Sequence, residues 1–242
     1  MLNDGGDALQ TPLHAQRILS LLIEDPHERM YVTTLRTTRL VRQGEVLFDE
    51  GQGSDGLYAT AESMVRLQRW IDGELRMLQF VGPFQWFGEL EAIDGLPRVA
   101  EAVAARTGPI LHLSTDALRL WWQSYPAARD HSLRLITAKL RHLIDESTAQ
   151  HRLTSEAFLA YHVLYLSRTL VDSDGSPAIL LPLTQTDLAA LLGVSRQRIN
   201  QILRQWQASR WISIHYRGME LLDRGALTRL AAGKRPFSSG TP

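Results

Sequence analysis

The segment LTQTDLAALLGVSRQRINQIL, residues 183–203, predicts two helices joined by a tight turn. Thr184 can cap the first helix, and Asp187 stands three positions later, which is the spacing of a capping box with Asp in place of the usual Glu. Gly193 can end that helix, because glycine adopts a positive φ angle at low steric cost. Ser195 can then cap the second helix. The segment therefore predicts a helix-turn-helix.

The second predicted helix has one apolar and one polar face. The apolar stripe, at helical spacing, consists of Ile199, Ile202, Leu203 and Trp206. The opposite face suits DNA, because arginine offers a fork of donors to guanine and glutamine can pair with adenine. Its members are Arg196, Gln197, Arg198, Gln201 and Arg204. We expect this helix to lie in the major groove, and the alternative is an ordinary helical hairpin with a solvated basic face.

Residues 211–223 alternate between apolar and polar side chains around an Arg-Gly pair. Such alternation on both sides of a short turn predicts a two-stranded hairpin. Arg217 would stand at its tip and contact phosphates, as would Arg204 and Arg210. The helix-turn-helix is therefore predicted to be of the winged type.

The N-terminal half has a different texture. Residues 12–24 have helical spacing and predict a short helix that ends before Pro26. From Met30 to Leu113, short alternating runs are separated by turn residues such as GQGSDG at 51–56, which predicts many short strands in a barrel or sandwich. Four tryptophans are expected to fill its core and its junction with the helices, with Trp86 as an alternative pocket-lining residue. They are Trp70, Trp86, Trp121 and Trp122.

Residues 116–145 predict helix again, with one break at Pro126. Beyond the break, apolar residues follow an a/d rhythm. They are Leu133, Ile136, Leu140, Leu143 and Ile144. We favour a seam between two copies of the chain, because a DNA-binding module needs a partner, and the alternative is a helix that lies on its own domain. Helix resumes over 155–171, and the DSDGSP segment that follows predicts a turn.

Charge is unevenly distributed, although the net charge of the chain is zero. Residues 1–157 contain 16 Lys and Arg against 21 Asp and Glu, whereas residues 158–242 contain 10 against 5. A basic C-terminal module attached to an acidic N-terminal one is typical of a DNA-binding regulator.

Composition and motifs exclude several functions. The chain has no cysteine, which excludes disulfides and thiolate chemistry and is typical of a reducing compartment. The histidines lack the spacing of a zinc or haem clamp, so we expect no metal site. No hydrolase, phosphate-loop or metalloprotease motif occurs, so we do not expect an enzyme. Since the sequence has no long apolar run and no leader, we expect a cytoplasmic protein without a membrane segment.

The chain as a whole resembles the CRP/FNR family of bacterial transcription regulators over residues 38–230. The resemblance rests on four segments, which are GEVLFDEG at 44–51, LYATAESMVRL at 57–67, FGEL at 87–90 with DGLPR at 94–98, and the segment at 183–203. It implies an α+β fold with an N-terminal β-roll, a jelly roll like that of cyclic-nucleotide-binding domains, then a long dimerisation helix and a C-terminal winged helix-turn-helix. The expected domains are 1–115 (N-terminal helix and β-roll), 116–157 (dimerisation helix and hinge) and 158–242 (DNA-binding domain).

The resemblance also implies partners. We expect a homodimer that binds a palindromic site in double-stranded DNA and acts with RNA polymerase. By this likeness Arg196 contacts base and phosphate, while Gln197 and Gln201 replace a glutamate and an arginine of other members, which leaves the half-site sequence open. The expected DNA-binding residues are Thr184, Ser195, Arg196, Gln197, Arg198, Gln201, Arg204 and Arg217.

In the cyclic-nucleotide branch of the family, the amides of a Gly-Glu turn and an Arg-Ser or Arg-Thr pair hold the ring phosphate. Gly88, Glu89 and Arg98 are retained here, the glutamate for the ribose hydroxyl and the arginine for the phosphate. Val99 replaces the hydroxyl, a loss that weakens binding about tenfold to hundredfold. The resemblance implies cyclic AMP or another cyclic nucleotide as effector, with Ser147 and Thr148 near its base. The implied effector-binding residues are Gly88, Glu89, Leu90, Arg98, Val99, Ser147 and Thr148.

Three alternatives remain open at this point. Glu89 and Arg98 can form an internal ion pair within an empty β-roll. The chain can be a DNA-binding regulator that needs no effector. It can also be a ligand-binding module that acts on a protein partner.

Overall fold

The computed structural model describes residues 19, 23–169, 180–181, 183–215 and 218–233 of the chain. The chain divides into two compact units, residues 1–138 and 139–242, at a point within the long helix α5 (Pro126–Arg152). The helix predicted at 12–24 lies largely outside the described residues.

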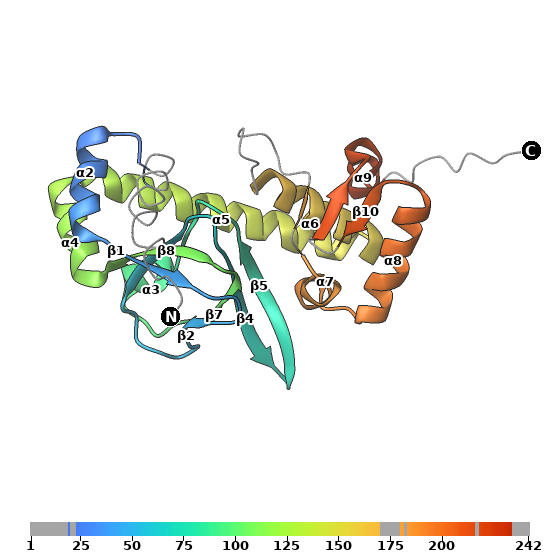
Figure 1. The fold of residues 1–242 in the computed structure, drawn as a ribbon, viewed down its shortest axis with the longest axis horizontal. Helices are drawn as coiled ribbons and strands as arrows, with labels where there is room; N and C mark the ends of the chain where they lie inside the picture. Colours follow the sequence, from blue (N-terminus) through green and yellow to red (C-terminus); the bar gives the residue numbers. More distant parts are fainter. Residues whose placement is uncertain (1–18, 20–22, 170–179, 182, 216–217, 234–242) are drawn as a thin grey trace, which may run out of the picture. The chain divides into compact units, whose positions relative to one another are not determined.

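The first unit contains two four-stranded antiparallel sheets (Figure 1). Their strand orders are β1-β8-β3-β6 and β2-β7-β4-β5, so that consecutive strands mostly belong to different sheets, as in the predicted β-roll. The strands are β1 (Thr37–Val41), β2 (Val46–Phe48), β3 (Gly56–Thr60), β4 (Met64–Ile71), β5 (Glu74–Val81), β6 (Trp86–Phe87), β7 (Glu101–Arg106) and β8 (Gly108–Ser114).

Apolar side chains from both sheets fill the space between them. They are Val41, Phe48, Tyr58, Val65, Val81, Phe87, Ala102, Ala104 and Ile110. Strand β3 is buried along its whole length. Its alternate residues Leu57 and Ala59 belong to a second core that includes Val32, Leu118 and Trp121 from the helices. The first sheet is therefore covered by the second sheet on one face and by helices on the other.

Helix α2 (Pro26–Leu35) corrects the predicted start of the strands at Met30. Residues 23–25 are not helical, so the helix before them does end ahead of Pro26, as predicted. The side chain of Asp25 caps α2 by accepting hydrogen bonds from two amides of its first turn, at 2.7 and 3.2 Å. Pro26 fits the first helical position, because the amide proton that proline lacks has no partner there in any helix. The proline therefore starts a helix, and the strands begin only at Thr37.

The tryptophan prediction is wrong at one position. Trp86 and Trp121 are buried, with their ring centroids 6.0 Å apart, and Trp122 packs partly buried against the same core. Trp70 is 66% exposed. It lies near the tip of the β4–β5 hairpin, which extends beyond the sandwich (Figure 1), so no core is available to it.

Helices α4 (Thr115–Ser124) and α5 confirm the predicted break at Pro126. Ser114 caps α4 by accepting a hydrogen bond from Ala117 N at 3.2 Å. A short helix, α3 (Glu89–Asp94), follows β6 and carries part of the predicted phosphate loop.

The second unit is mainly helical. Its elements are α6 (Ser155–Thr169), β9 (Leu180–Leu181), α7 (Gln185–Leu192), α8 (Arg196–Ala208), β10 (Ile212–His215), β11 (Gly218–Leu221) and α9 (Arg224–Ala231). The wing is an antiparallel sheet of order β10-β11-β9, so the predicted hairpin gains a third strand. Helix α9 was not predicted, although Asp223 caps it and its apolar residues pack it on α6.

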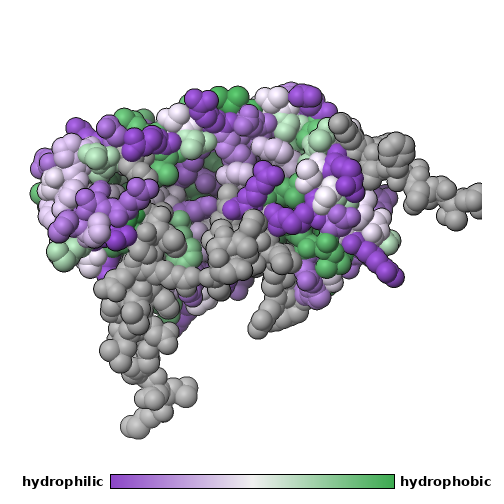
Figure 2. Space-filling model, turned by 90° about the horizontal axis from the view of Figure 1, so that it is seen from above, coloured by the Kyte–Doolittle hydropathy of each residue, from purple (hydrophilic) through white to green (hydrophobic). Residues whose placement is uncertain are grey.

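On the face shown in Figure 2, hydrophilic residues predominate and hydrophobic residues occur in small groups. Isolated apolar side chains on a protein surface are ordinary. Within the part of the chain that the structure describes, no helix combines the length and apolarity needed to cross a membrane.

Candidate functional site

Helices α7 and α8 form the predicted helix-turn-helix. The hydroxyl of Thr184 accepts a hydrogen bond from Asp187 N at 3.1 Å, and the carboxylate of Asp187 accepts one from Thr184 N at 2.9 Å. Gly193 ends α7 with a φ of 64°. Ser195 accepts a hydrogen bond from Arg198 N at 3.2 Å and so caps α8. The predicted caps are confirmed, and they fix where the recognition helix α8 begins.

Helix α8 buries one face and exposes the other. The buried residues, each at most 2% exposed, are Ile199, Ile202, Leu203 and Trp206. Trp206 also donates a hydrogen bond to the carboxylate of Glu156 on α6, at 3.0 Å. The predicted polar residues Arg196, Gln197, Arg198, Gln201 and Arg204 are all exposed. The packing therefore presents the polar face on a rigid element.

The exposed face of α8 contains an open hollow. It is lined by Gln197, Asn200, Gln201, Arg204 and Gln205. Asn200 and Gln205 were missed by the sequence reasoning, although their amides are of the kind that reads base edges. Their positions three and four residues after Gln197 and Gln201 place them on the same helical face, and this spacing was the available indication.

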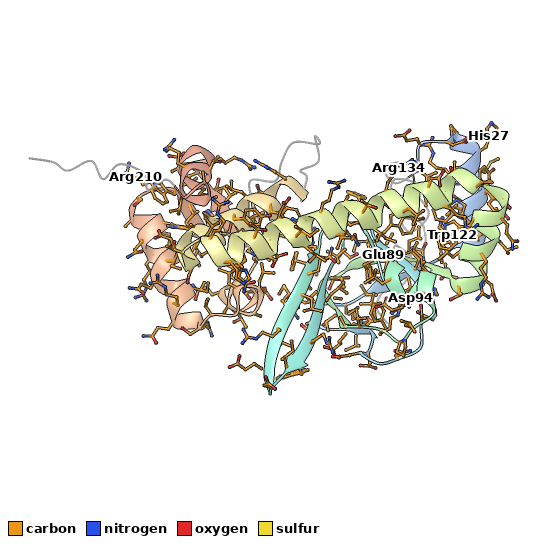
Figure 3. The ribbon with its side chains drawn as sticks, turned by 180° about the vertical axis from the view of Figure 1, so that it is seen from behind. His27, Glu89, Asp94, Trp122, Arg134 and Arg210 are labelled. Atoms are coloured by element: carbon orange, nitrogen blue, oxygen red, sulfur yellow. The ribbon has the colours of Figure 1, made fainter. Side chains whose placement is uncertain are left out.

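The other predicted DNA contacts have different positions. Arg198 donates a hydrogen bond to Gln201 Oε1 at 2.8 Å, so these two side chains are held together. Arg210, labelled in Figure 3, follows α8 and is exposed, with a φ of 57°. Arg217 lies outside the described residues.

A second polar site lies in the β-roll around Arg98, whose side chain is fully buried. Its Nη1 donates to the carbonyl of Gly88 at 3.0 Å and to Glu91 Oε2 at 3.2 Å. Its Nη2 donates to Asp55 Oδ1 at 2.7 Å and to the carbonyl of Gly56 at 2.8 Å. A buried charge is stable only when it is paired and hydrogen-bonded, and this guanidinium is both.

Aromatic rings complete the surroundings of Arg98. The guanidinium carbon lies 4.1 Å from the ring centroid of Phe48 and 5.6 Å from that of Tyr58. Both rings belong to the core between the sheets. The cation therefore also contacts the faces of two core aromatics.

Glu91 connects Arg98 with the residue that follows it. Its Oε1 accepts a hydrogen bond from Val99 N at 2.9 Å. The alternative considered for the sequence paired Arg98 with Glu89, whereas the carboxylates paired with Arg98 are those of Asp55 and Glu91. Glu89, labelled in Figure 3, is the first residue of α3. Residues two apart on a helix do not share a face, so α3 directs only one of these glutamates at Arg98.

Asp55 links Arg98 to two further side chains. Its Oδ2 accepts a hydrogen bond from the hydroxyl of Tyr58 at 2.5 Å and lies 3.7 Å from His112 Nε2. Burial raises the pKa of Asp55, but hydrogen bonds from Tyr58 and Arg98 outweigh it and hold that pKa below its usual value. Burial lowers the pKa of His112. Asp55 is therefore an ionised partner of Arg98.

Gly88 shapes the turn before α3. Its φ is 74°, in the left-handed region that favours glycine. A Cβ atom at this position would lie 2.6 Å from Arg98 Nη1. The predicted loop residue Leu90 is 47% exposed, as is Val99. The Gly-Glu turn is therefore built closely around the buried arginine.

The remaining predicted residues lie on α5. Ser147 and Thr148 belong to the second unit and are exposed, and Thr148 donates its hydroxyl to the carbonyl of Ile144 at 2.8 Å. Four of the five apolar residues of the predicted seam are 54–60% exposed in the single chain. They are Leu133, Leu140, Leu143 and Ile144.

Each of the two sites lies in a stretch of the chain that matches a known family model. A model of the cyclic nucleotide-binding domain matches residues 38–125, and a model of the Crp-like helix-turn-helix domain matches residues 159–230. The cyclic AMP receptor protein of Thermus thermophilus is 30% identical over 166 residues, which cover 68% of this chain and 74% of the relative. The chain belongs to the CRP/FNR family of transcription regulators.

Two other proteins are similar over a larger share of the chain at lower identity. A CRP-like cAMP-activated global transcriptional regulator of Mycobacterium tuberculosis is 27% identical over 191 residues, which cover 78% of this chain and 85% of the relative. The structure of FixK2 from Bradyrhizobium japonicum has a similar fold, with a TM-score of 0.71 at 18% identity, over 84% of this chain and 99% of that one. The relative from Mycobacterium tuberculosis is named as a transcriptional regulator, and the chain shares the α+β fold of FixK2.

Proposed function

We propose that this chain is a homodimeric, sequence-specific transcription regulator that binds a palindromic site in double-stranded DNA through α8. The observation that carries the proposal is the capped, anchored recognition helix with an exposed face of arginines and glutamines. A regulator of this kind acts in the cytoplasm, where it meets RNA polymerase at its promoters.

Within this proposal, one group of residues contacts bases and another contacts phosphates. Arg196, Gln197, Arg198 and Gln201 read base edges near the start of the helix, where the major groove is approached most closely. The phosphates are held by Arg204, Arg210 and Arg217, together with the caps at Thr184 and Ser195. The charge difference between the two halves of the sequence supports this division.

The first experiment tests DNA recognition. Bound sequences are enriched from a random duplex library with the full chain, and the consensus is then measured by fluorescence anisotropy. We expect Arg196→Ala to weaken consensus binding by about 1–3 kcal/mol, roughly fivefold to 150-fold. The matched control is Arg119→Ala, because Arg119 is an exposed arginine on α4 in the other unit. Full affinity in Arg196→Ala would refute the assignment.

The dimer rests on the exposed apolar residues of α5. Leucines more than half exposed on one long helix favour burial against a second copy, since burying apolar area contributes about 25 cal/mol per Å². We expect Leu140→Glu to convert the dimer to a monomer in sedimentation velocity. Leu120→Glu, which changes an exposed leucine on α4, is the control that should stay dimeric. A Leu140→Glu protein that remained dimeric would exclude this seam.

Binding of a cyclic nucleotide such as cyclic AMP in the β-roll is a second candidate function. The retained Gly88, Glu89 and Arg98 support it, and so does the match to the cyclic nucleotide-binding domain. The pairing of Arg98 with two carboxylates favours instead a regulator that binds DNA without such an effector.

A further inference from the structure

Glu91 brings a carboxylate into the interior of the β-roll. It is the third residue of α3, and its side chain is only 5% exposed. Asp94 is the last residue of the same helix and is exposed; it is labelled in Figure 3. A buried carboxylate needs a cation and hydrogen-bond donors. Glu91 has both, from Arg98 and from the amide of Val99.

The two residues that bind Glu91 stand where the family resemblance places the phosphate-binding Arg-Ser pair. Arg98 Nη1 donates to Oε2 at 3.2 Å, and Val99 N donates to Oε1 at 2.9 Å. A cation and a backbone amide that converge on the two oxygens of one group form an anion site. The anion in this site is a side chain of the same protein.

Both Nη atoms of Arg98 are already engaged by partners in the same unit, whereas its buried Nε has no hydrogen-bond partner among the residues that the structure describes. Its Nη2 is hydrogen-bonded to Asp55 and to a backbone carbonyl, and its Nη1 serves a second carbonyl besides Glu91. One guanidinium therefore already faces two carboxylates. A phosphate placed beside it would bring a like charge close to Glu91 and Asp55, which is unfavourable in a buried site.

We propose that Glu91 is a built-in anion that occupies the phosphate position of the β-roll, so that the chain excludes cyclic nucleotides. A tethered group has an effective concentration on the order of millimolar, so a nucleotide at micromolar concentration displaces it only if its other contacts offset a difference of about a thousandfold. Removal of the Glu91 side chain frees two donors and turns the β-roll into a phosphate-binding site. This proposal rests on the proposed function in its effector-independent form. The exclusion of cyclic nucleotides can nevertheless be measured without DNA.

The test compares three full-length proteins, which are the wild type, Glu91→Ala and Asp94→Ala. Asp94→Ala is the matched control, because it removes the same charge from the exposed end of α3 while Arg98 keeps its partners. Isothermal titration calorimetry measures cyclic AMP and cyclic GMP binding. Thermal unfolding with and without inorganic phosphate supplies a second readout that needs no nucleotide.

We expect the wild type and Asp94→Ala to bind neither nucleotide, and their melting temperatures to ignore phosphate. Glu91→Ala binds a cyclic nucleotide with a Kd at least about tenfold below the highest concentration at which the wild type shows no binding, and phosphate raises its melting temperature. Adding Val99→Ser to Glu91→Ala restores the missing hydroxyl and tightens binding by about another tenfold.

Three outcomes overturn the proposal. The first is saturable binding of a cyclic nucleotide by the wild type. The second is a folded Glu91→Ala protein that gains neither nucleotide binding nor stabilisation by phosphate. The third concerns a Glu91→Ala protein that does not fold without phosphate. The proposal predicts that phosphate restores its folding, so a protein that stays unfolded in both buffers overturns it. Loss of DNA binding would fail the proposed function alone, because none of these readouts involves DNA.

Discussion

The arginine of the β-roll and those of α8 carry the same functional group in opposite surroundings. Arg98 is fully buried, and both carboxylates that it contacts belong to its own unit. Arg196, Arg198 and Arg204 are exposed, and within the described ranges no ion pair involves them. The first arginine is paired inside its own unit, whereas the others keep their charge at the surface. An arginine motif alone does not distinguish these two situations, because it does not show which carboxylates of the chain reach the side chain.

The largest expected effect tests the buried side of this comparison. Arg98→Ala leaves the carboxylates of Glu91 and Asp55 without their cation, so we expect the free energy of unfolding of the first unit to fall by about 3–5 kcal/mol. Arg69→Ala is the control, because Arg69 forms an ion pair with Glu50 at the surface, where such pairs contribute about 1 kcal/mol or less. Urea unfolding followed by circular dichroism measures both. Equal losses in the two variants would contradict the distinction.

Two glycines that flank α3 test how closely this helix packs against Arg98. Gly88 and Gly95 flank this helix with the same φ of 74°, but a Cβ at Gly88 would lie 2.6 Å from Arg98 Nη1, whereas a Cβ at Gly95 has nothing within 4 Å. Gly95→Ala should cost only the left-handed backbone strain, about 1–2 kcal/mol. Gly88→Ala should cost about 1–3 kcal/mol more, because it also displaces the arginine. Equal melting temperatures in the two variants would show that Arg98 can move aside for the added methyl group without loss of stability.

The pH dependence of Asp55 gives a smaller effect with a defined sign. Burial raises the pKa of Asp55, but hydrogen bonds from Tyr58 and Arg98 lower it by more, so the pKa in the folded state lies below the ordinary value of 3.8. The charge of Asp55 therefore stabilises the folded state fully at a pH above the pKa of the unfolded state, 3.8. That stabilisation is lost as the pH falls through the lowered pKa of the folded state. We expect Asp55→Asn to be less stable than the wild type by about 1 kcal/mol at pH 7, with the difference shrinking below pH 3.8. Unfolding at pH 3 and pH 7 checks this, and a difference that did not depend on pH would contradict it.

The smallest expected effect tests the exposed side. Arg204→Ala removes a solvated arginine from α8, so stability should change by no more than about 0.5 kcal/mol. DNA affinity should weaken uniformly across sequences, and the salt slope of binding should fall by about 1, as for one lost phosphate contact. Anisotropy titrations at several salt concentrations measure the slope. A clear loss of stability would mean that this arginine, like Arg98, serves the fold.

Much of the fold could be predicted because its decisive interactions are local. The caps at Thr184, Gly193 and Ser195 and the apolar stripe of α8 involve residues no more than one or two helical turns apart. Two local patterns misled the prediction. Proline at position 26 marks a helix end, but it also begins α2, which the sequence reasoning missed when it started the strands at Met30. An alternating strand such as β4 does not show where its sheet ends, so the pattern predicts a buried Trp70 although this side chain is exposed.

The sequence by itself determined the helix-turn-helix, the antiparallel β-roll, the long helix and the family. It also identified Arg98 as a residue of special chemistry. Only the tertiary structure decided which anions meet this arginine. Asp55 lies 43 residues before it in the chain, and Glu91 faces it because the turn at Gly88 sets the direction of α3. Periodicity describes a side chain's face on its own element, whereas the partner of a buried charge depends on how distant elements fold together.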